Sequence, residues 1–322
     1  YLKSVSPAAT IDSYVMPLLA AGASTTHAFT WTPPISGSGN IYGEVYLSTD
    51  TVPGNNTTPN LPITIYPEGT WIEGFEAGYI PSDWTLRTGD TGSYNWEIYS
   101  TNPRTGTKCV AVRWESSTLA NNDWLITPPI QLSATAEDNI SFWLGKFSTS
   151  YSEEWEVLIS TTTNQIADFT LIDSGAMASA FSGYEQKSYN LDAYGGAVVY
   201  IAVRYIGLNK LRFYADDFMG PALYVPAEPV VTVETVPTGI KLSWAANPYA
   251  KHYKIYADDD PYGLFNGAPI TTTSNEYIIT APAAKKFYKV VASTSALPSK
   301  AAEGPSFIEP PSFEELEKLN RK

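Results

Sequence analysis

Short stretches in which apolar and polar residues alternate recur through this chain, and they constrain its fold more than any other feature. In the middle of the chain they cover residues 140–144, 154–160, 198–205 and 211–214. Successive side chains of a β-strand point to opposite faces, so a period of two predicts half-buried strands. Polar and glycine-rich connections separate these stretches, and the chain carries 24 prolines and 22 glycines. The sequence therefore predicts an all-β protein of short strands and turns.

The length and charge of the chain limit its number of domains and the partners that it can bind. At 322 residues it is long enough for two or three domains. Its 33 acidic residues outnumber its 20 basic residues, for a net charge of -13. Nucleic-acid binding needs a basic face, so we predict no nucleic-acid partner. No apolar run approaches the roughly 18 residues of a membrane-spanning helix, so we also predict no membrane insertion.

Cysteine and histidine are scarce, which argues against several kinds of active site. Cys109 is the only cysteine, so no intramolecular disulfide can form, and its alternating neighbours predict a buried, inert thiol. The two histidines, His27 and His252, lie in different predicted domains. A histidine-based zinc site or a Ser-His-Asp triad therefore has little to be assembled from. We predict that the chain is not an enzyme.

Three short motifs occupy the middle of the chain in a characteristic order. They are Gly74-Phe75-Glu76 near its start, Asn122-Asp123-Trp124 midway, and Ala215-Asp216-Asp217-Phe218 at its end. This order and spacing resembles the cleaved-adhesin domain, also described as choice-of-anchor J and MAM-like, of secreted bacterial surface proteins. The resemblance implies a jelly-roll β-sandwich over residues 69–225. It also implies a domain that binds or displays and does not catalyse.

Residues 1–68 read as short strands at 28–31, 41–47 and 61–66, separated by proline- and glycine-containing turns. The pattern resembles the later half of an immunoglobulin-like module of the CARDB type. The first strands of such a module look absent. Two explanations stay open: the chain was cut from a longer repeat array, or a neighbouring chain supplies the missing strand and builds a filament.

Residues 226–305 follow a stiff proline-containing linker and resemble a fibronectin type III module. The resemblance rests on segments 240–244, 252–257 and 287–292, which match strands B, C and F of that family. It implies that Trp244 fills the core and that Tyr288 is the strand-F tyrosine. In the tail, residues 306–322, Ser312 and Glu315 have capping-box spacing, which predicts a short terminal helix, with a frayed tail as the alternative.

Glu76, Asp216 and Asp217 form the strongest candidate site. The first and last strands of a jelly roll run side by side, so these carboxylates are expected to meet. Ca²⁺ prefers about six to eight oxygen ligands, so we predict a structural Ca²⁺ there, with Asp90 on a nearby loop as a looser candidate. Because a strand alternates faces, only one aspartate should point inward, and we expect Asp217. The alternative is that Glu76 and Asp217 accept backbone N–H groups or pair with Arg204.

Other residues that suggest chemistry have a simpler structural interpretation. Asp123 is expected to accept a local N–H bond before Trp124. Asp258-Asp259-Asp260 is expected to form a solvated turn. Four tryptophans could stack on a sugar or could pack in the core. We favour the core, because aromatic residues of β-sandwiches are usually buried. The four are Trp96, Trp114, Trp143 and Trp155.

These features predict a three-module extracellular protein of the kind secreted by Bacteroidota-like bacteria. Its predicted function is adhesion or surface display, with glycan or protein bound through a calcium-stabilised jelly roll. Two alternatives stay open. The chain is a structural subunit of an extracellular filament or coat, or it is an accessory binding region of a larger secreted hydrolase. The sequence indicates no particular ligand.

Overall fold

The computed structural model describes residues 1–5, 8–17, 19–20, 23–29, 37–65, 69–178, 183–280, 282 and 285–296. Within these ranges nearly every element is a β-strand, which confirms the all-β class. The helices there are three single 3-10 turns: η1 (Pro53–Asn55), η2 (Ile166–Asp168) and η3 (Asp192–Tyr194). No helix in the described part of the chain is long and apolar enough to cross a membrane. The predicted terminal helix lies outside the described residues.

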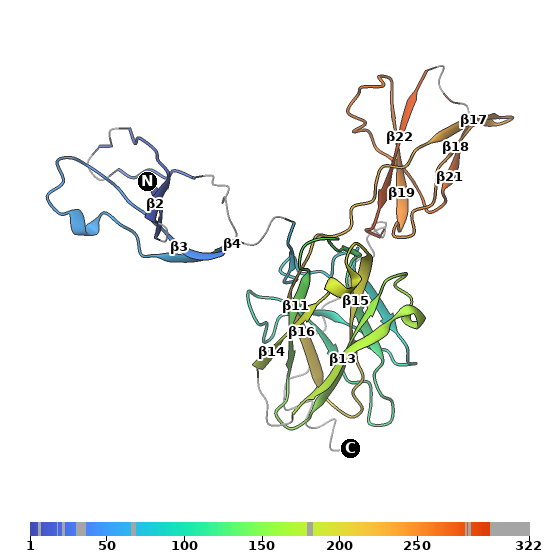
Figure 1. Cartoon of the computed structure of the whole chain (residues 1–322), viewed down its shortest axis with the longest axis horizontal. Coiled ribbons are helices and arrows are strands. Elements are labelled where there is room, and N and C mark those ends of the chain that lie inside the picture. Colours follow the sequence, from blue (N-terminus) through green and yellow to red (C-terminus); the bar gives the residue numbers. More distant parts are fainter. Residues whose placement is uncertain are drawn as a thin grey trace. The chain divides into compact units, whose positions relative to one another are not determined.

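The chain divides into two compact units, Tyr1–Trp71 and Ile72–Lys322. The first holds one antiparallel sheet in the order β2-β1-β3-β4, made of β1 (Leu2–Val5), β2 (Ala8–Asp12), β3 (Gly37–Gly43) and β4 (Leu61–Ile65) (Figure 1). The strand predicted at 41–47 begins earlier, because Gly37–Ile41 pair with β4. Residues 28–29 are not in a strand, and 30–31 lie outside the described residues.

The central part of the second unit is a sandwich of two antiparallel sheets. The β12 sheet has the order β13-β12-β15-β9-β6, and the β11 sheet has the order β14-β11-β16-β8-β7. The β12 sheet consists of β6 (Thr85–Thr88), β9 (Asp123–Ile126), β12 (Glu153–Ser160), β13 (Thr170–Met177) and β15 (Val198–Tyr205), with β10 (Ile130–Gln131) paired to β15. The β11 sheet consists of β7 (Glu97–Tyr99), β8 (Cys109–Arg113), β11 (Asn139–Lys146), β14 (Gly183–Asn190) and β16 (Arg212–Gly220).

The short strand β5 (Trp71–Glu73) pairs with β16, so the first and last strands of the sandwich lie side by side, as the jelly-roll resemblance implied. Figure 1 shows β11, β14 and β16 in one layer and β13 and β15 in the other. The core between the layers is aromatic. Trp84 packs against Phe75 at 5.2 Å and against Phe218 at 4.9 Å between ring centroids. Such pairs add stabilisation beyond the area they bury.

Cys109 begins β8 and is fully buried, as its alternating neighbours predicted. Burial raises the pKa of its thiol to about 12. The thiol therefore stays protonated at neutral pH, and the thiolate that would act as a nucleophile is not formed.

A smaller sandwich follows. Its two three-stranded sheets have the orders β17-β18-β21 and β20-β19-β22. Their strands are β17 (Thr232–Val236), β18 (Gly239–Ser243), β19 (His252–Asp258), β20 (Ile270–Thr272), β21 (Glu276–Thr280) and β22 (Phe287–Ser293). Trp244 is only 5% exposed and packs in the core with Leu242, Tyr253 and Val290. The core position expected of Trp244 is confirmed, and the fibronectin type III class stays a prediction.

The small sandwich contacts the central one through the turn before β19. The Lys251 ammonium donates to the carbonyl oxygens of Ser82, Asp83 and Trp84 at 2.9–3.0 Å. The Tyr249 ring lies between Tyr200 and Tyr224, with centroid distances of 6.2 and 4.8 Å. The two sandwiches are therefore joined by packing and hydrogen bonds as well as by the chain.

Candidate binding site

Glu76 follows β5 and holds the loop at 100–108, which links β7 to β8. Its carboxylate accepts the backbone N–H groups of Thr107 and Lys108 at 2.9–3.0 Å and the Thr107 hydroxyl at 3.0 Å. The backbone N–H groups are the main reason that its pKa is lowered. Glu76 thus stabilises this loop by accepting backbone N–H groups, which is the alternative to calcium binding that the sequence left open.

Asp216 and Asp217 hold the same loop from β16. Asp216 accepts the Arg104 backbone N–H at 2.9 Å. Asp217 accepts the Arg104 guanidinium at 2.7 Å and the Thr105 hydroxyl at 2.6 Å. All three carboxylates therefore contact the same loop, Asp216 and Asp217 at residues 104–105 and Glu76 at residues 107–108, but among the described residues they do not gather into one group of potential metal ligands. Arg204, the other predicted partner, pairs with Glu156 instead, at 2.7 Å.

The expected orientation of the two aspartates was wrong. Asp216 is fully buried, whereas Asp217 is partly exposed. The pairing of β11 with β16 shifts here, from Trp143 opposite Asp216 to Ser141 opposite Met219, and Asp217 has a φ of 49°. A β-bulge inserts one extra residue and interrupts the alternation of faces. Burial raises the pKa of Asp216 to about 6.

The carboxylate oxygens of Glu76, Asp216 and Asp217 are suitable ligands for Ca²⁺, but only those of Asp216 and Asp217 lie close together. A β-carbon placed on Gly74 would lie 3.4 Å from Asp217 Oδ1 and 4.0 Å from Asp216 Oδ1, so two carboxylates face one small space. Glu76 bonds to the far end of the loop, at 107–108. No group of three or more potential ligands of the His, Cys, Asp or Glu type gathers in the described part of the chain.

Asp90 belongs to a different place. It accepts the N–H of Gly92 at 2.7 Å and that of Asn122 at 2.5 Å, so it fastens the loop after β6 to the turn before β9. Asp123 begins β9 and accepts the Asn121 side-chain amide at 2.8 Å, instead of the local backbone N–H that we expected. Burial raises the pKa of Asp123 to about 7.

The four tryptophans do not form one platform. Trp96 and Trp155 are 3% and 4% exposed, so both belong to the interior, and Trp114 is partly buried. Trp143 is partly exposed, and the Arg104 guanidinium covers its ring at 3.7 Å from the centroid. The triple aspartate forms the predicted turn, in which Asp258 accepts the N–H groups of Asp260 and Phe265.

Sequence reasoning missed a row of tyrosines on the outer face of the β11 sheet. Tyr99 and Tyr214 stack with centroids 5.7 Å apart and planes 19° apart, and Tyr214 and Tyr184 stack at 6.2 Å and 26°. They come from β7, β16 and β14. We call these three residues, with Trp143 on β11, the tyrosine face. Its members lie far apart in the sequence, so only the pairing of the strands brings them together.

Small residues make room for these rings. Gly145 on β11 stands opposite both Tyr184 and Tyr214, and Ala111 on β8 stands opposite Tyr214. A β-carbon on Gly145 would lie 2.8 Å from the Tyr184 ring, which is closer than packing allows. The rings therefore lie flat along the sheet, and the alternation of small and large residues was the signal that could have revealed them.

Two arginines mark the ends of the tyrosine face. Arg104 stacks on Trp143 and pairs with Asp217. Arg212 lies 4.2 Å from the Tyr99 ring centroid and pairs with Glu97 at 2.9 Å. Each guanidinium is held between a ring and a carboxylate, so its remaining N–H groups are presented in a fixed direction.

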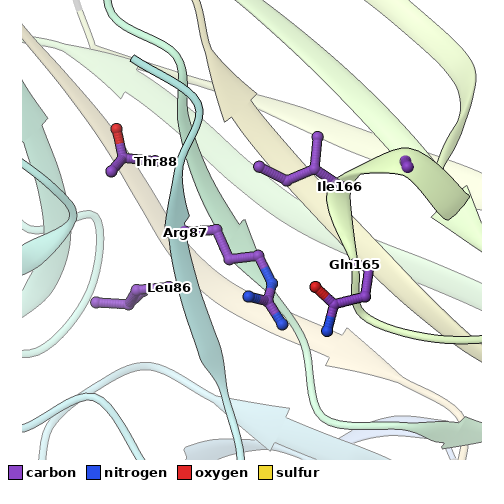
Figure 2. Close-up of a pocket in the computed structure, with 6 residues that line it drawn as sticks. Leu86, Arg87, Thr88, Gln165 and Ile166 are labelled. Atoms are coloured by element: carbon purple, nitrogen blue, oxygen red, sulfur yellow. The ribbon is translucent and has the colours of Figure 1, made fainter. Parts of the chain in front are cut away.

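A separate pocket of about 390 Å³ lies beside the β12 sheet, between β6 and the segment that contains η2 (Figure 2). Its walls are formed by Leu86, Arg87, Thr88, Gln165, Ile166 and Ala167. The Arg87 guanidinium donates to the Asn164 backbone oxygen at 2.7 Å and to the Asn164 side-chain oxygen at 2.8 Å.

Residues 70–218 match the family model described as Cleaved Adhesin Domain. Hemagglutinin A of Porphyromonas gingivalis is 26% identical over 208 residues, which cover 56% of this chain and 10% of that protein. A second Hemagglutinin A of the same species is 24% identical over the same length and is covered to 8%. The chain thus spans about a tenth of the length of the curated relatives that it matches.

Two solved structures are similar to part of this chain. The K1 cleaved adhesin domain of Lys-gingipain from Porphyromonas gingivalis has a TM-score of 0.41 and 23% identity, covering 48% of this chain and 99% of that one. The CBM22-1 xylan-binding domain from Paenibacillus barcinonensis has a TM-score of 0.34 and 12% identity, covering 48% and 95%.

Proposed function

Because residues 70–218 are a cleaved adhesin domain, we propose that this chain is an extracellular, non-catalytic adhesion module that binds glycan through the tyrosine face. The family supports a binding role. The partly exposed rings of Tyr99 and Tyr184, which stack on the fully buried Tyr214, carry the proposal for where binding occurs.

The chemistry of the tyrosine face suits a sugar. The partly exposed rings of Tyr99 and Tyr184 offer flat apolar surface, which packs against the C–H faces of a pyranose. Arg104 and Arg212 supply N–H donors at both ends, where sugar hydroxyls can accept them. Binding sites combine such apolar walls with a few fixed polar groups.

The opposite outer face is a poorer candidate because the chain covers it. Ile166, Phe169 and Tyr249 pack against Trp124, Leu158 and Tyr200 on the β12 sheet. Tyr99, Tyr184 and Trp143 on the β11 sheet keep part of their surface exposed to solvent.

The proposal is tested by screening the whole chain against a glycan array, with Trp143→Ala as the variant. We expect the bound glycans to be lost or weakened at least about tenfold, which corresponds to about 1.4 kcal/mol. Tyr262→Ala is the matched control, because Tyr262 is an aromatic residue of the small sandwich that is 93% exposed. Equal loss in both variants, or no glycan bound by the wild type, contradicts the proposal and favours a protein ligand.

Calcium remains a proposal for the Asp216 and Asp217 pair, as a stabiliser of the 100–108 loop. Its support is the oxygen-rich donor set and the space beside Gly74. A ligand that binds only the folded state raises the melting temperature. We expect added calcium to raise it in the wild type and not in Asp217→Asn. If the wild type and Asp217→Asn have the same melting curves with and without calcium, the proposal of a calcium site is wrong.

Self-association through the first unit also stays a proposal, supported by its four-stranded sheet, in which β2 and β4 are edge strands that can pair with a strand of another chain. Light scattering on the whole chain and on a chain that lacks residues 1–10 checks it. A mass that depends on concentration and falls on deletion supports a filament subunit, and a monomer at every concentration removes the idea.

A further inference from the structure

The pocket between β6 and residues 165–167 has a positively charged arginine in its wall, although the protein as a whole is acidic. Arg87 lies in its wall, whereas the chain as a whole carries a net charge of -13. Two of the hydrogen bonds described above, from Arg87 Nε and Nη2 to Asn164, fix the guanidinium in place. A fixed arginine loses little side-chain freedom when it binds a ligand, so it recognises an anion at low entropic cost.

The fixed guanidinium still has donors to offer. Among the residues that the structure describes, Arg87 Nη1 has no hydrogen-bond or ion-pair partner. The Gln165 side-chain amide also has none there, because the hydrogen bonds of Gln165 are made by its backbone: its N–H donates to the Thr163 hydroxyl at 3.1 Å, and its carbonyl accepts the Asp168 N–H at 3.0 Å. Figure 2 shows the Arg87 and Gln165 side chains extending toward one another across the pocket. Two unused donors therefore face one space.

The nearby carboxylates are occupied, so they do not compete for Arg87. Asp168, at the end of η2, accepts the Thr163 hydroxyl. Asp90, on the loop after β6, accepts the backbone N–H groups of Gly92 and Asn122. The ion pairs of the described residues leave Arg87 without a carboxylate partner, unlike Arg104, Arg204 and Arg212.

We propose that this pocket binds the carboxylate of an acidic sugar, of the hexuronic acid class. Arg87 Nη1 and the Gln165 amide donate to the two carboxylate oxygens, a charge-assisted arrangement that is stronger than neutral hydrogen bonding. Ile166 supplies an apolar wall for the sugar ring on the side of β6 that Arg87 faces. The pocket volume of about 390 Å³ lies within the range of small-molecule sites. This site belongs to the β12 sheet and is independent of the tyrosine face.

Calorimetric titration of the whole chain with glucuronate and, separately, with glucose tests the proposal. We expect glucuronate to bind and glucose to bind at least about tenfold more weakly, because glucose lacks the carboxylate. Raising the salt concentration should weaken glucuronate binding, since a partly exposed ion pair is screened. Equal binding of the two sugars, or binding of neither, overturns the proposal.

Gln165→Glu places a negative charge in the pocket on an exposed residue, so the fold should tolerate it. We expect it to weaken glucuronate binding at least about tenfold by like-charge repulsion. Gln186→Glu, an identical change at an exposed position of β14 on the other sheet, is the matched control and should leave binding unchanged. If Gln186→Glu weakens binding and Gln165→Glu does not, the acidic sugar binds at the tyrosine face and the pocket is overturned as a site.

Discussion

The two outer faces of the central sandwich are both rich in aromatic residues, yet the protein uses them differently. On the β12 sheet, Trp124 and Tyr200 are 3% and 5% exposed because other parts of the chain pack onto them. On the β11 sheet, Tyr214 is fully buried at the centre of the cluster, and Tyr99 and Tyr184 beside it stay partly exposed. An aromatic residue on an outer face therefore does not by itself indicate a ligand site.

The covering elements explain the difference. Ile166 and Phe169 come from the connection between β12 and β13, and Tyr249 comes from the small sandwich. They turn one outer face into an internal interface. Among the residues that the structure describes, Phe147 packs on the aromatic cluster of the β11 sheet. The 100–108 loop lies beside that cluster, is held by Glu76, Asp216 and Asp217, and accepts the Tyr184 hydroxyl at the Asn102 carbonyl. The β11 face is consequently the one on which we place the neutral glycan.

The same substitution on each face should give the largest contrast in stability. Trp124 is buried, donates to Asn122 at 2.8 Å and packs on Phe169. We expect Trp124→Ala to lower the free energy of unfolding by about 3–5 kcal/mol, as for other buried tryptophans. Trp143→Ala should cost only about 1 kcal/mol, mainly the stacking with Arg104. Urea denaturation measures both, and equal losses would mean that the two faces are equally buried.

Removing the lysine that joins the two sandwiches should have the next largest effect. Lys251→Met keeps the length of the side chain and removes the donor to the three carbonyl oxygens at 82–84. We expect a loss of about 1.5–3 kcal/mol, typical of hydrogen bonds to a charged group. Calorimetry should then show the small sandwich melting separately.

Lys254→Met, on β19, is the matched control for that measurement. If Lys251→Met and Lys254→Met melt in the same way, the covered face is not held by the small sandwich, and the contrast between the faces is weaker than described.

The buried carboxyl groups near each face predict how stability depends on pH. In the folded state the pKa of Asp123 is raised to about 7, from an ordinary value of 3.8. Because the Asp123 carboxyl binds its proton more tightly in the folded state than in the unfolded state, low pH favours folding. This contribution is complete below pH 3.8 and is lost as the pH rises through about 7, by at most about 1.4 kcal/mol per pH unit.

Denaturation of Asp123→Asn at several pH values checks this. The free energy of unfolding of this variant should fall less steeply than that of the wild type as the pH rises to about 7. Asp216→Asn, beside the tyrosine face, should flatten it only up to about pH 6. If both variants keep the pH profile of the wild type, neither carboxyl group is protonated in the folded protein.

Much of the fold could be predicted from residue patterns, because burial on one face imposes a period of two. The strand at 198–205 has the predicted ends, and β11 and β12 extend the predicted 140–144 and 154–160 by at most two residues at either end. The strand predicted at 211–214 continues to Gly220. The bulge at Asp217 breaks the period, so the pattern could not follow the strand past that residue.

The candidate site was harder to predict, because it depends on contacts between distant segments. The contact of Glu76, Asp216 and Asp217 with one loop follows from the pairing of β5 with β16. The donors that occupy them come from the 100–108 loop, which carries no sign of that role in its sequence. Trp124 and Trp143 look alike in the sequence, and only the segments packed on one of them separate an interface from an open face.

The central claim is that neutral glycans bind at the open face and not at the covered one. The most direct test is to titrate the isotope-labelled chain with the best neutral glycan from the array and follow its backbone amide resonances. The account predicts shifts in β7, β11, β14 and the 100–108 loop, and none at 163–169 or 249–251. Shifts confined to 163–169 or to the small sandwich, with β7 and β11 unchanged, would contradict it.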